Sequence, residues 1–425
     1  MVVCCLVLTV CAASAQSGFH TIAANRSLSA SNYGIYPDSI EPANTPSPAG
    51  KKPFYISHYG RHGSRYLANR KGYDIPYRML CKADSLDELT PIGQDVLREL
   101  RQIIDDSEGR WGDLTGLGKK QQRNIAQRMM ARFAEAFPDG THIDARSTTA
   151  SRCILSMGAA VQEMVALKPT LRPTMHADRR DMFFLNHQDK QLRDSMMPFA
   201  ARQAYDVFVA KRERNPRLME LLFVDPECVR EHVDEGWLSY YLLKTGLVQQ
   251  NTHMYSKTSL VDMFSYEEIH QFWQRENAWW YINYGPSPLS GGVQPYSQRF
   301  LLRKIIADAD SCIRRAQPTV QLRFGHETVL LPLVCLMGIN GYDYQTPDLE
   351  RLEDDGWWAC LVFPMASNIQ LVFYRESPRD KDILVKVLLN EREATLPFPT
   401  DVAPYYHWSD FRDYYLRKLD AYDGK

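Results

Sequence analysis

The sequence lacks a charge imbalance. Its 50 Lys and Arg residues face 51 Asp and Glu residues, which leaves a formal net charge of -1. A chain with so little net charge creates no general field that would attract nucleic acid or an anionic membrane surface. We therefore expect no nucleic-acid partner, and any site that binds an anion has to be built locally.

Long hydrophobic runs are also scarce. The apolar stretch at the start, MVVCCLVLTV, is shorter than the roughly 20 residues that a membrane-spanning helix needs. It is followed by Ala13-Ser14-Ala15, which fits the small-x-small pattern of a cleavage site. We therefore predict that residues 1–15 are a signal peptide and that the chain is exported, either to the periplasm or as a secreted, possibly vesicle-associated protein, without stable insertion into a membrane.

Paired cysteines are missing as well. None of the nine cysteines forms a CxxC pair, and no spacing matches a zinc site. Export permits disulfides, but a chain of 425 residues that is 44% hydrophobic can bury a large core without them. We assign no disulfide and no metal to the six cysteines that follow the signal, namely Cys81, Cys153, Cys228, Cys312, Cys335 and Cys360.

The chain shows no internal repeat and no low-complexity tract, so its organisation is sought in strand and helix patterns. A buried strand is expected at 54–57 and a second one at 142–145, each followed by a cationic residue. Helices are expected from Thr115 to Pro138 and from about Ser147. Strand patterns return near the end of the chain, at 318–326, 357–365, 368–376 and 382–390.

Between these two sets of strands the pattern changes. From 172 to 296, aromatic-rich amphipathic helices alternate with charged runs, and no strong strand pattern occurs. We therefore predict an α/β core formed by 16–171 and 297–425, with 172–296 as an inserted, mostly helical domain. Ligands of such folds lie beyond the carboxyl ends of the strands.

The first strand runs into the sequence GRHGSRY, which places Arg61, His62 and Arg65 directly behind a buried segment. A match to R-H-G-x-R is expected by chance only about 0.008 times in a chain of this composition. The alternative to a functional motif is a basic turn on the surface. Burying unpaired guanidinium groups is very costly, so a buried pocket of this kind would have to bind an anion.

Two further strand ends carry candidate residues. Arg146 follows the strand at 142–145, and His326 with Glu327 follows the strand at 318–326. Neither candidate is strong evidence of a site by itself. A lone arginine at a strand end is more often part of a structural ion pair. If the three strands are neighbours in a parallel sheet, their ends meet, and the arginine forks match the oxygens of a phosphate.

Four segments, GRHGSRY, LTGLGKKQQ, DARSTTASR and FGHETVLLPL, resemble in their order the signatures of the histidine acid phosphatase family. The resemblance implies a three-layer sheet core of the histidine phosphatase type and a reaction without metal or other cofactor. It implies that His62 is the nucleophile and that Glu327, kept protonated at mildly acid pH by burial, is the proton donor. The implied phosphate clamp consists of Arg61, Arg65, Arg146 and His326.

The acidic residue indicates a branch of this family. Phytases and acid phosphatases usually have Asp after the histidine, whereas Glu is typical of the multiple inositol polyphosphate phosphatases. That branch commonly reads His-Ala-Glu, and here Glu327 follows His326 directly, while Leu67 stands where many relatives have Pro. The resemblance implies a small polyanionic substrate, phytate and lower inositol phosphates. A histidine acid phosphatase of broad substrate range and a non-catalytic phosphate or sugar-phosphate binding protein are the alternatives.

Other residues are candidates for the outer phosphates of such a substrate. His176, Arg179 and Arg180 open the expected insertion, close to the point where the chain leaves the sheet, although a charged run is usually a solvated face. His58 and His142 are interpreted as structural. The same holds for an aromatic group that we expect in a helix core, Phe272, Trp273, Trp279 and Trp280.

Overall fold

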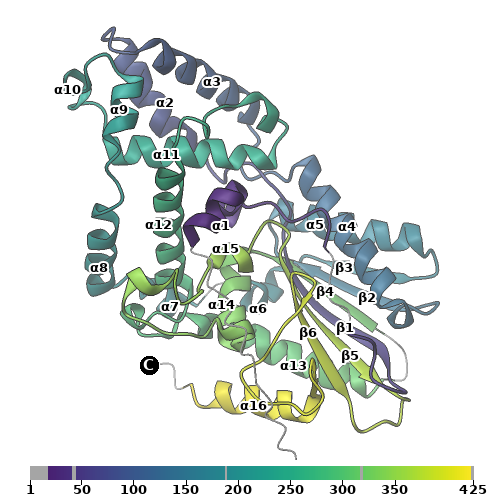
Figure 1. Cartoon of the computed structure of the whole chain (residues 1–425). Coiled ribbons are helices and arrows are strands. Elements are labelled where there is room, and N and C mark those ends of the chain that lie inside the picture. The colour runs from purple at the N-terminus through teal and green to yellow at the C-terminus, as the bar shows by residue number, and fades with distance from the viewer. Residues whose placement is uncertain (1–17, 41–44, 187–188, 316–318, 423–425) are drawn as a thin grey trace, which may run out of the picture.

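The computed structural model describes residues 18–40, 45–186, 189–315 and 319–422 (Figure 1). The signal peptide predicted for residues 1–15 lies outside these ranges. Within them, no helix combines the length and the apolar character that crossing a bilayer requires. The six cysteines in this part of the chain are free thiols.

One mixed sheet forms the centre of the molecule. Its strand order is β3-β2-β4-β1-β5-β6-β7, and β8 pairs with β6. The neighbours β3, β2, β4 and β1 are parallel, whereas β5 to β8 are antiparallel to their neighbours. The strands are β1 (Lys52–Arg61), β2 (His142–Ser147), β3 (Arg172–His176), β4 (Thr319–Gly325), β5 (Asn368–Arg375), β6 (Leu384–Leu389), β7 (Arg392–Glu393) and β8 (Tyr405–His407).

Helices cover both faces of this sheet. Ile56 of β1 packs in a core with α4 (Gly116–Arg132) and α5 (Ser151–Leu167). Its neighbour Tyr55 points to the opposite face, because side chains alternate along a strand, and packs with the helices there. These helices are α13 (Arg299–Ile313), α14 (Glu327–Met337) and α16 (Trp408–Asp420). The predicted three-layer α/β core is confirmed, and burial on both faces explains why β1 and β4 read as apolar runs.

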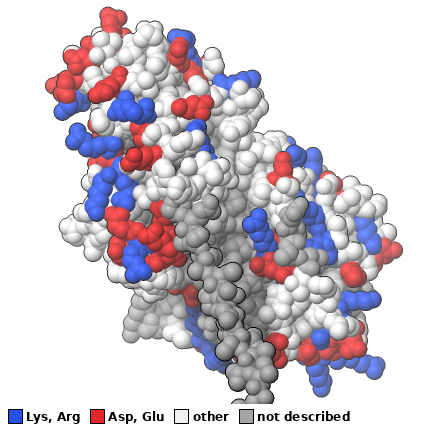
Figure 2. All heavy atoms as spheres, viewed as in Figure 1, with Lys and Arg blue, Asp and Glu red and all other residues white. Residues whose placement is uncertain are grey.

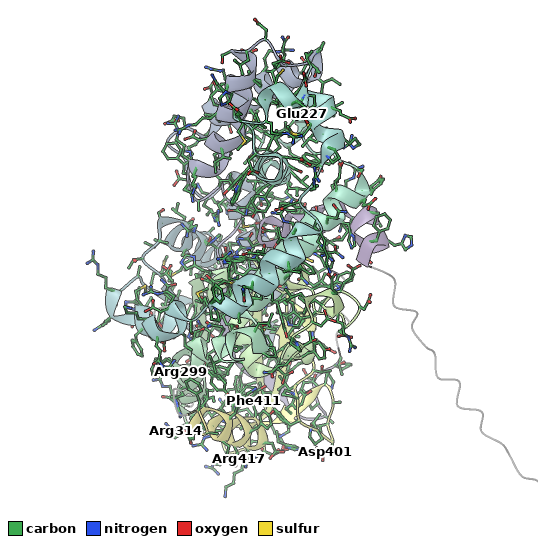
Figure 3. The ribbon with its side chains drawn as sticks, turned by 90° about the vertical axis from the view of Figure 1, so that its left-hand side faces the viewer. Glu227, Arg299, Arg314, Asp401, Phe411 and Arg417 are labelled. Atoms are coloured by element: carbon green, nitrogen blue, oxygen red, sulfur yellow. The ribbon has the colours of Figure 1, made fainter. Side chains whose placement is uncertain are left out.

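A second, helical part lies beside the sheet (Figure 1). Its apolar core is shared by α2 (Lys71–Asp84), α3 (Pro91–Ser107), α9 (Pro216–Leu222), α11 (Glu235–Val248) and α12 (Tyr266–Tyr284). Figure 3 shows Glu227 in this part, at the opposite end of the molecule from Arg299 of α13 and Phe411 of α16. The helical part therefore forms a domain of its own.

This domain differs from the predicted insertion 172–296 at two points. The helices α2 and α3 precede the insertion in the chain, yet they bury their apolar faces against it. The first residues of the predicted insertion, Arg172–His176, belong to the sheet as its edge strand β3. Strand β3 is mostly exposed, so it carries little of the apolar pattern by which a strand is recognised.

One predicted strand is a helix. The segment 357–365 contains α15 (Ala359–Val362), whereas the strands predicted at 318–326, 368–376 and 382–390 are found as β4, β5 and β6. Trp357 and Phe363 pack into the core of the sheet domain, and Trp358 packs into that of the helical domain. A segment that is buried by two domains is apolar throughout, and such a run cannot be told from a buried strand by periodicity.

Short elements complete the fold. The remaining α-helices are α1 (Gly18–Ala24), α6 (Met182–Leu185), α7 (Lys190–Asp194), α8 (Phe199–Ala210) and α10 (Pro226–Val229). The 3-10 helices are η1 (Arg26–Tyr33), η2 (Ala134–Ala136), η3 (Arg179–Asp181), η4 (Gln249–Asn251), η5 (Tyr255–Lys257), η6 (Pro288–Ser290), η7 (Gln294–Gln298), η8 (Ile339–Gly341) and η9 (Leu349–Arg351). Of these, η1 matters most for the site described next.

Candidate active site

The carboxyl ends of β1 and β4 bring four of the predicted residues together. Arg61 lies opposite Gly325 in the parallel register, and the His62 N–H donates to the Gly325 carbonyl at 3.0 Å. The next residues on each chain therefore lie side by side, with the rings of His62 and His326 edge to face at 5.6 Å. Glu327 follows as the first residue of α14.

Two glycines let the loop after β1 approach helix α4. A Cβ atom on Gly63 would lie 2.3 Å from the carbonyl oxygen of Gly118, and one on Gly118 would lie 2.4 Å from the carbonyl oxygen of Ser64. Thr115 caps α4 by accepting from the Gly118 N–H, and its hydroxyl donates to the Ser64 carbonyl. The glycines of GRHGSRY and LTGLG thus hold His62 in place by backbone packing.

The hydrogen bonds of His62 define its tautomer. Its Nδ1 lies 2.9 Å from the Gly63 carbonyl oxygen, which only accepts, so Nδ1 carries the proton. Burial, together with the charges of Arg61 and Arg65, lowers the pKa of His62 well below its usual value. The ring is therefore neutral, with the lone pair on Nε2.

Arg61 and Arg65 are buried beside this ring. Arg61 donates from Nε to Glu327 Oε2 at 3.0 Å and from Nη1 to the Phe363 carbonyl at 2.6 Å. Arg65 donates from Nη1 to the Tyr66 carbonyl at 2.9 Å. Each guanidinium group keeps further N–H groups that these partners do not use.

Buried nitrogens without a hydrogen-bond partner gather at this site. Buried polar atoms are normally satisfied, so such atoms need an explanation. Among the described residues of the loop after β1 and of the helices next to it, nitrogens of this kind are Arg61 Nη2, His62 Nε2, Arg65 Nε, Gln121 Nε2 and Arg152 Nε. Guanidinium donors beside the lone pair of His62 fit an electrophilic anion such as a phosphate ester.

Arg146 is not part of this group. Its Nη1 donates to Asp181 Oδ2 at 2.7 Å, and its Nε lies 3.2 Å from Asp144 Oδ1. It pairs in register with Arg323, whose side chain is bound to Asp308 of α13. Two carboxylates neutralise Arg146 on this face of the sheet, so the structure supports the structural ion pair and not the expected role in the clamp.

Arg152, the second arginine of this motif, is electrostatically coupled to the site. It lies in the first turn of α5, and after burial it is the strongest influence that lowers the pKa of His326, to about 4. The motif RSTTASR contains both arginines, and the point where β2 ends and α5 begins decides which of them acts on His326 with its charge. A helix start directly after the strand was the signal that could have identified Arg152.

Glu327 lies between the arginines and the nucleophile candidate. Burial by itself would raise the pKa of Glu327, but the positive charges of Arg61 and Arg65 outweigh it and hold this pKa well below the usual range. The carboxyl group is thus ionised in the free protein, contrary to the expectation that burial keeps it protonated. Its Oε1 also accepts from Asn32 Nδ2 at 3.0 Å, a contact that no sequence pattern indicated.

His326 completes the site from the other side. Its Nε2 lies 3.2 Å from Thr148 Oγ1. One ligand atom each of His62, His326 and Glu327 lies within 4.8 Å of the others, which is close enough to hold a metal ion. The adjacent guanidinium groups of Arg61 and Arg65 would repel a cation, so these residues fit an anion better.

A cleft of about 1180 Å³ lies next to this site and is lined mainly by residues of the helical domain. Asn32 and Tyr33, which contact Glu327 and Arg65, line it together with Lys244 and Arg275. The Tyr33 ring has Arg65 at 5.0 Å and Lys244 at 5.9 Å, so the cationic residues of the cleft begin next to the site. Acidic residues line it too, and Figure 2 shows both signs of charge mixed over the surface.

The other predicted residues lie elsewhere. His176 and Arg180 are near Asp178, at 3.9 and 3.3 Å, and Arg180 is largely exposed. His176 is the last residue of β3, whereas Arg179 and Arg180 lie in the exposed turn η3, and none of the three is among the residues that line the cleft. Their assignment to outer phosphates is not supported, because the cleft opens toward α11 and α12 instead.

The two histidines interpreted as structural are outside the site. His58 is buried against the ring of Phe324 at 5.4 Å, and burial lowers its pKa to about 3. His142 Nε2 lies 3.0 Å from Thr174 Oγ1 on the neighbouring strand. The aromatic group lies mainly in the cores, where Phe272, Trp273 and Trp280 are buried, and both Trp279 and Trp280 also line the cleft.

Comparisons with known proteins agree with this arrangement. No family model matches the chain. It is 24% identical over 342 residues to human "Multiple inositol polyphosphate phosphatase 1", which covers 73% of this chain and 67% of the relative. The motif-based resemblance to the multiple inositol polyphosphate phosphatases is thereby confirmed.

Solved structures show the same fold. The Bifidobacterium longum multiple inositol polyphosphate phosphatase in complex with inositol hexasulfate has a TM-score of 0.76 at 16% identity, covering 91% of this chain and 97% of that one. Its phosphate complex has a TM-score of 0.73 at 17% identity, with the same coverage. The phytase from D. castellii has a TM-score of 0.67 at 13% identity, covering 93% and 86%. The α/β core with its helical domain is therefore the phytase fold.

Proposed function

We propose that the protein is a metal-independent phosphomonoesterase that hydrolyses phytate and lower inositol polyphosphates through a phosphohistidine intermediate. The observation that carries the proposal is the set of buried nitrogens without a partner around His62, Nε2 of that ring among them. The homologue is named a multiple inositol polyphosphate phosphatase, and a neighbour of the same fold is described with inositol hexasulfate.

The first step is attack by His62 Nε2 on phosphorus. The Nε2–P bond forms while the bond from phosphorus to the ester oxygen breaks, and the Nδ1 proton stays on the ring, where its hydrogen bond to the Gly63 carbonyl stabilises the positive charge. Phosphoryl transfer spreads charge over three equatorial oxygens. Arg61 Nη2, Arg65 Nε and the guanidinium of Arg152 supply the matching donors.

The second requirement is a proton for the leaving alkoxide. The phosphate dianion neutralises Arg61 and Arg65, which are the groups that keep the pKa of Glu327 low, so binding of substrate raises this pKa. Glu327 then donates its proton to the leaving oxygen. As a carboxylate it next accepts a proton from the water that attacks phosphorus and releases His62.

The cleft supports a substrate with several phosphates. Arg275 has a buried Nε without a partner among the residues described, and its guanidinium lies over the ring of Tyr240 at 5.2 Å. Lys244 donates to the Tyr240 hydroxyl at 2.8 Å and lies 3.7 Å from Glu276. Both cations are fixed along the path that leads out of the catalytic group, where phosphates neighbouring the scissile one would lie.

A rapid-quench experiment with ³²P-labelled phytate tests the mechanism. We expect a phosphoryl group on His62 that is labile in acid and stable in base, and none in the His62→Ala variant. Turnover that is unchanged in the variant would overturn the proposal. Phosphate binding without any turnover would instead support the binding protein, and a kcat/KM for small monoesters equal to that for phytate would support the broad-range phosphatase.

Metal independence has its own test. Because guanidinium groups compensate the phosphate charge, we expect the rate to be unchanged after dialysis against EDTA. Loss of activity that is restored by a divalent cation would instead assign a metal to His62, His326 and Glu327, whose ligand atoms lie close enough together.

We also propose that the chain is exported, on the basis of the signal pattern in residues 1–15. The pattern predicts cleavage after Ala15 when the full chain is expressed in a bacterial host. Intact-mass measurement of the protein in the periplasmic and medium fractions tests this, and an uncleaved chain that stays in the cytoplasm would contradict it.

A further inference from the structure

Asn32 contacts the carboxylate of Glu327 from a distant part of the chain. Its Nδ2 donates to Glu327 Oε1 at 3.0 Å, and its side chain is buried, with 8% of the residue exposed. We propose that Asn32 is a positioning residue that fixes the orientation of Glu327 and thereby keeps its Oε2 beside the nucleophile. This inference rests on the proposed function.

The two oxygens of Glu327 have different surroundings. Oε1 faces Asn32 at 3.0 Å and Arg65 Nη2 at 3.7 Å, and Oε2 faces Arg61 Nε at 3.0 Å and His62 Nε2 at 3.7 Å. The Asn32 amide N–H group and the Arg61 Nε–H group can only donate, so each holds one oxygen of the carboxylate as its acceptor. The carboxyl group is therefore fixed with Oε2 beside the nucleophile and Oε1 toward Asn32.

This placement matters for the chemistry. Oε2 lies 3.7 Å from His62 Nε2, the nitrogen that attacks, so a proton on this oxygen is the one nearest to the scissile bond. Bound phosphate competes with Glu327 for Arg61, and Asn32 is then the contact that stops the carboxyl group from turning. Holding a group in its reactive orientation is an established source of rate enhancement.

The main chain at Asn32 is held under strain. Ser31 has φ 53° and ψ −120°, a conformation that non-glycine residues rarely adopt. Such strain persists only where the surroundings enforce it, and it is typical of segments with a function.

The enforcing contacts tie the segment to the nucleophile loop. Asn251 Nδ2 donates to the Tyr33 carbonyl at 2.7 Å, and Asn251 Oδ1 accepts from the Ser64 hydroxyl at 2.7 Å. The Tyr33 hydroxyl accepts from Arg65 Nη1 at 3.4 Å. Asn32 and His62 are therefore fixed to the same framework, which keeps the amide, the carboxyl group and the nucleophile in one geometry.

The Asn32→Asp variant tests this inference, because it keeps the shape of the side chain and replaces the donor by an acceptor. We expect kcat/KM for phytate, whose alkoxide needs a proton, to fall by roughly 10-fold to 100-fold. For p-nitrophenyl phosphate, whose leaving group needs little protonation, we expect a loss of less than about threefold. In a Glu327→Gln background, Asn32→Asp is expected to change the phytate rate by less than about twofold.

A matched control separates positioning from stability. Asn283 is equally buried and donates from Nδ2 to the Trp279 carbonyl at 2.8 Å, away from Glu327. We expect Asn283→Asp to leave the ratio of kcat/KM for phytate to kcat/KM for p-nitrophenyl phosphate unchanged. Folding of Asn32→Asp is checked by the midpoint of its urea unfolding. If the variant does not fold, Asn32→Ala is used instead, with the same expected ratio of kcat/KM for phytate to kcat/KM for p-nitrophenyl phosphate.

The outcomes distinguish the two levels of the proposal. The role of Asn32 alone would be overturned if the Asn32 variant lost kcat/KM equally on both substrates. It would also be overturned if this loss added to that of Glu327→Gln in the double variant. A wild-type protein that hydrolyses neither substrate, or a Glu327→Gln variant that slows both equally, would overturn the proposed donor chemistry and the role of Asn32 with it.

Discussion

His62 Nε2 and Glu327 Oε2 lie 3.7 Å apart, and Arg61 Nε donates to the same carboxylate oxygen at 3.0 Å. Residues 265 positions apart in the chain thus meet as a neutral imidazole and an ionised carboxylate. The carboxylate balances part of the charge of two buried arginines in the free protein. An incoming phosphate would balance the charge of these arginines instead, and the carboxylate is then able to bind a proton.

The proton-donor role predicts a dependence on the leaving group. Glu327→Gln keeps the shape of the side chain and cannot transfer a proton. We expect kcat for phytate to fall by about 10²-fold to 10⁴-fold and kcat for p-nitrophenyl phosphate to fall far less. Steady-state rates on both substrates measure this, and equal losses would contradict the donor role.

The two arginines of DARSTTASR predict opposite outcomes. Arg152→Ala removes a donor to the transferring phosphoryl group, which every substrate has, so we expect kcat/KM to fall by about 10²-fold to 10³-fold on both substrates. The measurement is kcat/KM for phytate and for p-nitrophenyl phosphate.

Arg146→Ala serves as the matched control for this prediction. It leaves Asp144 and Asp181 without their cation, so we expect the free energy of unfolding to fall by about 1 kcal/mol while kcat/KM changes by less than about threefold. A large loss of activity in Arg146→Ala, together with normal activity in Arg152→Ala, would restore the original assignment of the clamp.

The cleft predicts a residue that acts on polyphosphates only. Lys244→Met combined with Glu276→Gln removes a cation of the cleft without leaving a buried charge unpaired. We expect KM for phytate to rise by about tenfold, because a charge-assisted contact to an outer phosphate is lost, and KM for p-nitrophenyl phosphate to stay the same.

A second buried pair provides the control for the cleft. Lys386 lies 3.0 Å from Glu393 in the sheet domain, and the variant Lys386→Met with Glu393→Gln is expected to leave both KM values unchanged. If the Lys244 variant raised KM for both substrates alike, Lys244 would act on the catalytic group itself and not on outer phosphates.

The sequence was most informative for the site residues that adjoin the ends of strands. Arg61 ends β1 and His62 follows it, while His326 and Glu327 follow β4, and parallel pairing of these two strands is enough to bring the four residues together. The fold class determines which strands pair, and the alternation of strands and helices along the chain already indicates that class. This part of the site could therefore be predicted from the pattern.

The remaining parts depend on boundaries and on distant contacts. Arg146 and Arg152 differ only in lying before or after the turn between β2 and α5, and boundaries are the least reliable feature of sequence reading. Asn32 reaches Glu327 across 295 residues, and no local pattern encodes such a contact. The same applies to α2 and α3, whose partners in the helical domain follow more than a hundred residues later.

The buried His58 predicts how stability depends on pH. Burial lowers its pKa from 6.5 to about 3, so between these values the unfolded chain binds a proton that the folded protein does not. Stability is therefore lost as pH falls below 6.5, by up to about 1.4 kcal/mol per pH unit from this residue. His62 and His326, whose pKa values are also lowered, act in the same direction.

Replacing His58 isolates its share of this dependence. His58→Leu removes the titrating group and its unpartnered Nδ1. We therefore expect the free energy of unfolding between pH 6 and about pH 4 to fall less steeply than in the wild type, with a slope that is smaller by the contribution of about one bound proton. Urea unfolding at several pH values measures the slope. The control is Phe324→Leu, which alters the packing against the same ring and should lower stability by the same amount at each pH. Parallel curves for wild type and His58→Leu would show that His58 is protonated equally in both states, because a group contributes to the slope only through a difference in bound protons.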